Sequence, residues 1–179
     1  MKLLHTADWH VGSTLAGLDR FDETGRLLDE LVDAARSERV DAVLVAGDVF
    51  DNPMPGNISQ KLVFDFFARL SEAGIRAIVL AGNHDGQVFV PSKSLLSLGT
   101  ASVFEKPSNE QFCVRFRSGA DEPVAVTALP YLHERVVIRL NGAGDDVRGD
   151  YAASVSGFIR WLTAQMDPQD INVFGARAR

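Results

Sequence analysis

Three short apolar runs, each followed directly by polar or glycine residues, constrain the fold of this 179-residue chain most strongly; they are residues 3–7, 42–46 and 77–81. Unbroken apolar runs of this length are typical of strands that are buried on both faces of a sheet. Two amphipathic stretches lie between the runs, at residues 27–35 and 62–70, with apolar side chains at helical spacing. This order predicts a β-α-β-α-β unit in which crossover helices join three parallel strands.

Cap residues and a change of pattern define the rest of the expected fold. Asn57 is placed to cap the start of the second helix, and Gly74 to end it in a left-handed conformation. A short helix is expected near residues 92–98. Beyond it we expect three extended pieces that form a second sheet, then a helix and a strand, at residues 102–104, 112–117, 124–129, 151–166 and 170–174. The chain is therefore expected to be an α/β protein with two sheets.

Composition and charge narrow the classes of function. With 46% hydrophobic and 23% charged residues and no low-complexity linker, the chain is expected to form one globular domain. No apolar run approaches the roughly 18 residues that span a bilayer, and the start lacks a secretory pattern, so we expect a cytoplasmic protein without a membrane segment. The net charge of -6 argues weakly against a basic nucleic-acid surface. Two bound divalent cations would nevertheless place four positive charges where a phosphate must sit.

Polar residues follow each predicted parallel strand, at the carboxyl ends where functional groups gather in open α/β sheets. They are Asp8 and His10 after the first strand, Gly47, Asp48 and Asp51 after the second, and Gly82, Asn83, His84 and Asp85 after the third. A single Asp or His is usually a turn, cap or surface residue, and His5 and His133, outside this pattern, are interpreted in that way. Three such strand ends in succession predict a metal site.

Each residue type suits a particular task at such a site. Asp8 and His10 are two residues apart, so in an extended segment both side chains would reach one ion. Asp48 has two carboxylate oxygens, one for each of two ions about 3.5–4 Å apart, and Asn83 offers a carbonyl oxygen. Carboxylate, imidazole and carbonyl donors together suit manganese, iron or zinc.

Three further residues have expected supporting or catalytic roles. His84 follows Asn83 directly and could present its imidazole as a general acid to the oxygen of a leaving group. Asp85, or Asp51, could orient that ring by accepting its second N–H. Glycines at positions 47 and 82 would let the backbone turn sharply and come close to the ions.

In this order, Asp8-Trp9-His10, residues 47–51 (Gly-Asp-Val-Phe-Asp) and residues 82–85 (Gly-Asn-His-Asp) resemble the first three signature motifs of the calcineurin-like metallophosphoesterases. Within that superfamily the flanking residues 4–12, 18–20 and 128–132 resemble the SbcD-type nuclease subunits of DNA repair. The resemblance covers nearly the whole chain. It implies an α/β fold of the metallophosphoesterase type, a layered β-sandwich flanked by helices and incomplete at its C-terminus.

The same resemblance implies a two-manganese DNA exo- and endonuclease that acts in double-strand-break repair and recombination. Such an enzyme works as a homodimer with an SbcC-like ATPase subunit. Carried over by motif, Asp8, His10 and Asp48 would bind the first ion, Asp48 and Asn83 the second, and His84 would be the catalytic acid. Asp51 and Asp85 would support these groups through hydrogen bonds.

The sequence departs from the family pattern in two places. Family members continue with a further histidine motif and a Gly-His-x-His motif, whereas residues 172–177 reach about the place of the first of these without a histidine. We therefore expect residues 1–179 to be a nuclease domain cut off before its last histidine motifs and poorly active as it stands. Residues 86–91 also lack the serine and arginine that usually follow the third motif.

Two other functions fit parts of this pattern. The three motifs are shared across the superfamily, so the substrate could be a small molecule or a phosphoprotein, which the acidic charge slightly favours. A non-catalytic domain that keeps a dimerisation or partner-binding surface is the third hypothesis. A dimer is also predicted from apolar side chains in excess of what one sheet face needs, at Phe64, Phe66, Phe67, Leu70, Leu95, Leu96 and Leu98.

Overall fold

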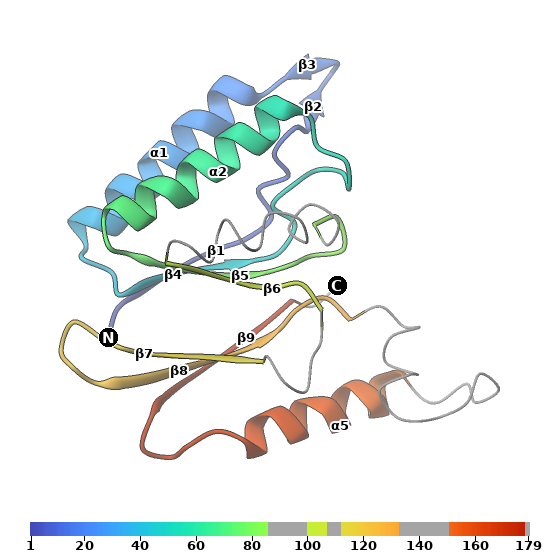
Figure 1. Cartoon of the computed structure of the whole chain (residues 1–179). Coiled ribbons are helices and arrows are strands. Elements are labelled where there is room, and N and C mark those ends of the chain that lie inside the picture. The colour runs from blue at the N-terminus through green and yellow to red at the C-terminus, as the bar shows by residue number, and fades with distance from the viewer. Residues whose placement is uncertain (86–99, 107–111, 133–150, 178–179) are drawn as a thin grey trace.

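The computed structural model describes residues 1–85, 100–106, 112–132 and 151–177. Figure 1 shows two stacked sheets with helices on their outer faces. Within the described residues, the first sheet has four parallel strands in the order β1 (Leu3–Thr6), β4 (Ala42–Ala46), β5 (Arg76–Leu80) and β6 (Ala101–Phe104). The second sheet has the order β7 (Cys113–Arg117), β8 (Pro123–Leu129) and β9 (Ile171–Ala176). This is the layered, helix-flanked α/β arrangement that the sequence predicted.

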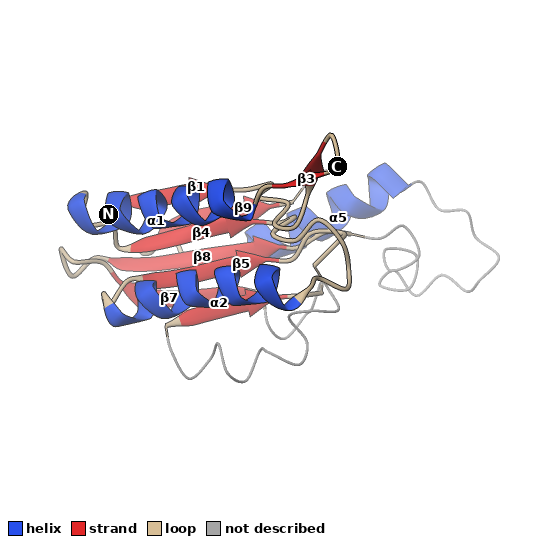
Figure 2. Ribbon diagram, turned by 90° about the horizontal axis from the view of Figure 1, so that it is seen from above, coloured by secondary structure: helices blue, strands red, loops and turns tan. Residues whose placement is uncertain are grey.

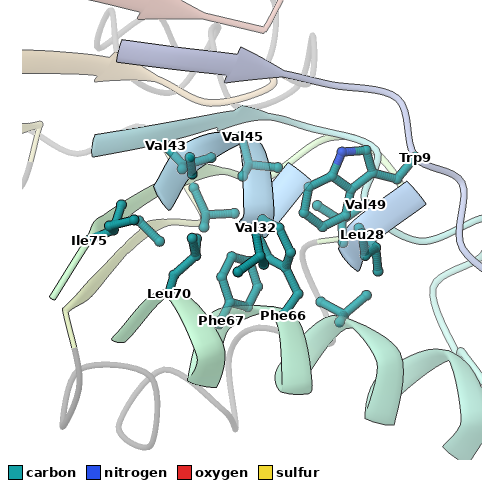
Figure 3. Close-up of a cluster of buried hydrophobic side chains, with 14 of the residues drawn as sticks. Trp9, Leu28, Val32, Val43, Val45, Val49, Phe66, Phe67, Leu70 and Ile75 are labelled. Atoms are coloured by element: carbon teal, nitrogen blue, oxygen red, sulfur yellow. The ribbon is translucent and has the colours of Figure 1, made fainter. Parts of the chain in front are cut away.

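Two helices cover the outer face of the first sheet. Figure 2 shows α1 (Phe21–Ser37) and α2 (Asn57–Glu72) side by side across its strands. A short hairpin of β2 (Thr14–Leu15) and β3 (Leu18–Asp19) lies between β1 and α1 in the chain. The helices bury their apolar faces against the sheet in a cluster that includes Trp9, Val43, Val45, Phe66 and Phe67, drawn in Figure 3.

The inner strands of the first sheet are buried on both faces, as their unbroken apolar sequences predicted. In β4, Val43 and Val45 join the cluster beneath the helices, whereas Ala42 and Leu44 join a second cluster between the two sheets. The outer face of the second sheet is covered by α5 (Tyr151–Ala164), whose Leu162 is fully buried. Four layers with three apolar contacts between them therefore hold the strand ends in place.

One strand belongs to a different sheet from the one predicted. We expected residues 102–104 to begin the second sheet, but β6 pairs in parallel with β5, with Ala77 opposite Ala101 and Leu80 opposite Phe104. A four-residue strand is too short for its pattern to identify its partner. Val103 packs with the cluster under the helices and Phe104 with the cluster between the sheets, as an added strand of the first sheet requires.

The helix ends agree with the predictions in part. Gly74 follows α2 with a φ of 69°, the left-handed conformation predicted for it. The N-cap of α2 is Gly56 rather than Asn57, which is the first helical residue. The helix expected at residues 92–98 lies outside the described residues. None of the helices in the described part of the chain is long and apolar enough to cross a membrane.

The aromatic side chains of α2 do not supply the surface that motivated the dimer prediction. Phe66, Phe67 and Leu70 are 2%, 3% and 0% exposed and lie in the internal core, and Phe64 packs against that core. A residue facing the sheet inside the protomer gives no contact area to a second copy. The leucines at 95, 96 and 98 lie outside the described residues, so only this half of the argument is overturned.

Candidate metal centre

The loops after β1 and β4 run side by side. Three N–H groups of the first loop donate to carbonyls of the second: Asp8 to Gly47 at 3.1 Å, His10 to Asp48 at 3.0 Å and Val11 to Val49 at 2.9 Å. This pairing continues beyond the end of β1 at Thr6 and fixes one loop relative to the other.

The three residues proposed to bind the first ion share an uncommon backbone conformation. Asp8, His10 and Asp48 have φ angles of 56°, 45° and 50°. Left-handed φ is rare for residues other than glycine, and residues held in this way concentrate at functional sites. The segment that carries Asp8 and His10 is therefore not the plain extended strand that the sequence predicted, because its backbone follows the neighbouring loop instead.

The side chains of Asp8, His10 and Asp48 nevertheless meet. One ligand atom from each lies within 4.8 Å of the other two, and Nε2 of His10 is 4.0 Å from Oδ1 of Asp8. Trp9, between the first two, turns away into the core, where its ring meets Phe66 edge-on at 4.9 Å (Figure 3). The backbone thus sends alternate side chains to the site and to the core.

Asp48 is the buried member of this group. The residue is 4% exposed, and among the described residues its Oδ1 atom has no hydrogen-bond partner. Gly82 packs directly on it, because a Cβ atom at position 82 would overlap Oδ1. The close approach predicted for this glycine is therefore present, and it brings the loop after β5 against the Asp48 carboxylate.

Asp85 fixes the loops from behind. It is fully buried, and its carboxylate accepts three backbone N–H groups: Phe50 at 2.9 Å on Oδ1, and Val49 at 3.1 Å and Gly82 at 2.9 Å on Oδ2. Burial raises the pKa of Asp85, with a smaller contribution from the Asp48 charge, while the three hydrogen bonds oppose this rise. We expected Asp85 to orient the His84 ring, but both of its oxygens bind backbone instead.

The remaining predicted residues lie at the same edge of the sheet. The ring of His84 is 5.9 Å from that of His10, in an edge-on arrangement. Asp51 places Oδ1 3.8 Å from Nδ1 of His10, so it faces His10 rather than His84. Asn83 is exposed and directly follows Gly82. Its part in binding a metal stays a prediction.

Arg177, which directly follows β9, is a site residue that the sequence analysis missed. Its Nη2 atom is 2.8 Å from Oδ1 of Asp8 and also pairs with Oδ2 of Asp48, and its Nη1 donates to Oδ2 of Asp8 at 3.1 Å. The hydrogen bond to Asp8 is the largest cause of a raised pKa for Arg177, with burial opposing it. The only sequence signal was a lone arginine just past a predicted strand, at the place where a histidine was sought.

Comparison with known proteins identifies the family. The family model described as calcineurin-like phosphoesterase matches residues 1–151, which contain all three strand-end motifs. The chain belongs to this family. A dimetal phosphatase from Danio rerio also has a similar structure, with a TM-score of 0.47 and 17% sequence identity over 90% of this chain and 51% of that one.

The curated relatives are SbcD subunits of the SbcCD nuclease. The chain is 38% identical to the one from Bacillus subtilis over 136 residues, which are 75% of this chain and 34% of the relative. It is 32% identical to the one from Escherichia coli over 139 residues, 77% and 34% of the two chains. For Rhodobacter capsulatus the figures are 32% identity over 177 residues, 92% and 44%. The chain is thus homologous to SbcD and spans about a third to less than half of its length.

Proposed function

We propose that this chain contributes the metal-binding edge of a metal-dependent phosphoesterase. The observation that supports this most directly is the meeting of Asp8, His10 and Asp48 within 4.8 Å, around a buried carboxylate oxygen that has no partner among the described residues. A buried, unpaired carboxylate oxygen is unfavourable, so it fits a bound cation. Membership in the calcineurin-like family supports the same reaction class.

The donors suit two ions. Asp8, His10 and Asp48 would hold the first, and Asp48 with Asn83 the second, since the Asp48 Oδ1 atom faces the glycine that precedes Asn83. Mixed carboxylate, imidazole and amide oxygen donors suit manganese. Bound ions would supply Lewis-acid charge and an activated water for attack on phosphorus. The Asp85 carboxylate keeps the Asp48 and Gly82 loops at the separation this site needs.

His84 would serve as the general acid. Its ring lies at the same edge of the sheet, 5.9 Å from the ring of His10, so a phosphate held beside His10 would have its leaving oxygen within reach of the second imidazole. The proton passes from His84 to that oxygen. Asp51, 3.8 Å from Nδ1 of His10, would hold the His10 ring in its ligating orientation.

We further propose that the substrate is DNA. The identity of 32–38% to SbcD subunits of the SbcCD nuclease supports a nuclease that cuts phosphodiester bonds in double-strand-break repair and recombination. The same relatives support an SbcC-like ATPase subunit as the partner, a homodimeric assembly and a cytoplasmic location. Because the chain spans a third of these relatives, this part of the proposal concerns a protein that includes these residues.

A phosphoesterase for a small molecule or a phosphoprotein is the second candidate. The net charge of -6 favours it, because DNA-binding surfaces usually gather Lys and Arg. The metal centre and the role of His84 would be the same in both cases. The two candidates differ only in substrate, which an activity assay can separate.

The experiment measures manganese-dependent hydrolysis of linear duplex DNA, p-nitrophenyl phosphate and a p-nitrophenyl phosphodiester. We expect low turnover of DNA, because the donor group contains a single imidazole, and we expect His84→Ala to reduce the rate by about 10²–10⁴-fold. His5→Ala is the matched control, because His5 is exposed on β1 outside the site. Hydrolysis of the small esters without DNA cleavage would favour the second candidate. Rates that are equal in wild type and His84→Ala would refute the proposed role of His84.

A further inference from the structure

The position of Arg177 bears on how any cation could enter this site. Arg177 belongs to the second sheet, where its backbone N–H donates to Leu129 at 3.0 Å. Its side chain crosses to the first sheet and places Nη2 against one oxygen of Asp8 and one of Asp48. A divalent ion shared by those two oxygens would sit roughly 2.0–2.2 Å from each. The ion and the guanidinium would therefore occupy the same space.

We propose that Arg177 is a built-in competing cation that closes the metal site, and that divalent ions bind only by displacing it. This inference rests on the metal site proposed above. Asp8 and Asp48 carry two negative charges and Arg177 returns one positive charge, so the pairing lets the buried Asp48 persist without a metal. An incoming ion must replace that charge in full.

The surroundings of Arg177 show a built seat. A Cβ atom at Gly47 would lie 2.9 Å from Cδ and 3.1 Å from Cγ of Arg177, so the stem of the arginine rests where only a glycine leaves room. The φ of Gly47 is 84°, which also favours glycine. The Arg177 side chain is 17% exposed. It is therefore packed into the site and not extended into solvent.

The same seat is imperfect, which makes displacement feasible. Among the described residues the Nε atom of Arg177 is buried without a hydrogen-bond partner, as is Oδ1 of Asp48. An outward rotation of the guanidinium would let water reach Nε, and an ion would satisfy Oδ1. An arginine that recruits a substrate phosphate would present free donors to solvent, whereas both Nη atoms here are bound to carboxylates.

The test compares manganese binding by Arg177→Met and wild type in isothermal titration calorimetry. Met keeps an apolar stem against Gly47 and removes the charge. Metal affinity scales with the fraction of protein whose site is open, so loss of a bidentate, partly buried pair should tighten manganese binding by about 10- to 100-fold. Arg115→Met is the matched control, because Arg115 pairs with Asp170 on the second sheet and is 57% exposed. It should bind manganese within about twofold of wild type, as expected for an exposed pair.

A second measurement covers the case in which Arg177→Met does not fold. In wild type, the Nε–H signal of Arg177 in a ¹⁵N nuclear magnetic resonance spectrum, assigned by its loss in Arg177→Lys, should shift and exchange faster with water at saturating Zn²⁺. A signal that stays unchanged at saturation, or manganese affinity that is equal or weaker in Arg177→Met, would overturn the inference. Tighter metal binding without hydrolysis of any phosphoester would uphold it and refute the proposed function instead.

Discussion

Replacing Asp85 with Asn tests whether the candidate metal centre is held by a buried carboxylate. Asp85 receives one backbone N–H on Oδ1 and two on Oδ2. Asn has the same shape but a single acceptor oxygen. If that oxygen faces Val49 and Gly82, the amide nitrogen must face the N–H of Phe50, and two donors then oppose each other in a fully buried place.

The magnitude follows from these contacts. A hydrogen bond to a charged group contributes roughly 1.5–3 kcal/mol, and a buried donor left without a partner costs about 1–3 kcal/mol. The change also removes a buried charge beside Asp48, which offsets part of the loss. We expect Asp85→Asn to lower the free energy of unfolding by about 2–4 kcal/mol, which corresponds to a fall in Tm of about 4–16 °C for a chain of this size.

Thermal and urea unfolding of the metal-free protein measure this change. Asp65→Asn is the matched control, because it removes the same charge from an exposed ion pair with Lys61 on α2, where about 0–1 kcal/mol is expected. Manganese should also bind more weakly to Asp85→Asn, since the loop that carries Asp48 loses an anchor. Unfolding of Asp85→Asn within about 0.5 kcal/mol of wild type would show that the three backbone contacts do not hold the loops.

Two further substitutions test other contacts. Gly82→Ala should destabilise the protein severely and abolish manganese binding, because its Cβ would overlap Oδ1 of Asp48; normal Tm and binding would refute this packing. Asp41→Asn should cost about 1 kcal/mol at neutral pH, since Asp41 accepts N–H groups of Lys2 and Gly119 and ties the first strand to the second sheet. Partial burial would raise the pKa of Asp41, but those hydrogen bonds outweigh it and lower the pKa. The stability difference should therefore be full at neutral pH and close as the pH falls below about 4, in unfolding curves recorded across pH.

The sequence determined the first sheet well because burial on both faces leaves an unbroken apolar pattern. The predicted strand at residues 42–46 matches β4 at both ends. It was less informative at the edges of sheets, where a short strand pairs with whichever neighbour the fold brings close. The strand β6 was assigned to the wrong sheet for this reason, and its pairing with β5 depends on residues far away in the chain.

The site could be predicted from residue types but not from their hydrogen bonds. Asp8, His10 and Asp48 were found because parallel strands bring their carboxyl ends to one edge, and the structure does bring these three together. The partner of Asp85 was predicted incorrectly, since a carboxylate beside a histidine in sequence suggests a pair between their side chains. The backbone N–H groups that bind it instead leave no mark in the sequence.

Arg177 shows why a search for metal ligands by residue type is incomplete. Such a search collects donors of negative charge, but a buried carboxylate such as Asp48 needs positive charge nearby in every state of the protein, with or without a metal. The cation that meets this need comes from the second sheet, 129 residues away in the chain. It lies over Gly47, a residue that the sequence analysis had assigned to close approach by ions. A glycine facing a carboxylate cluster therefore indicates space for a cation, and the residue at the end of the nearest strand decides whether an arginine fills that space before a metal does.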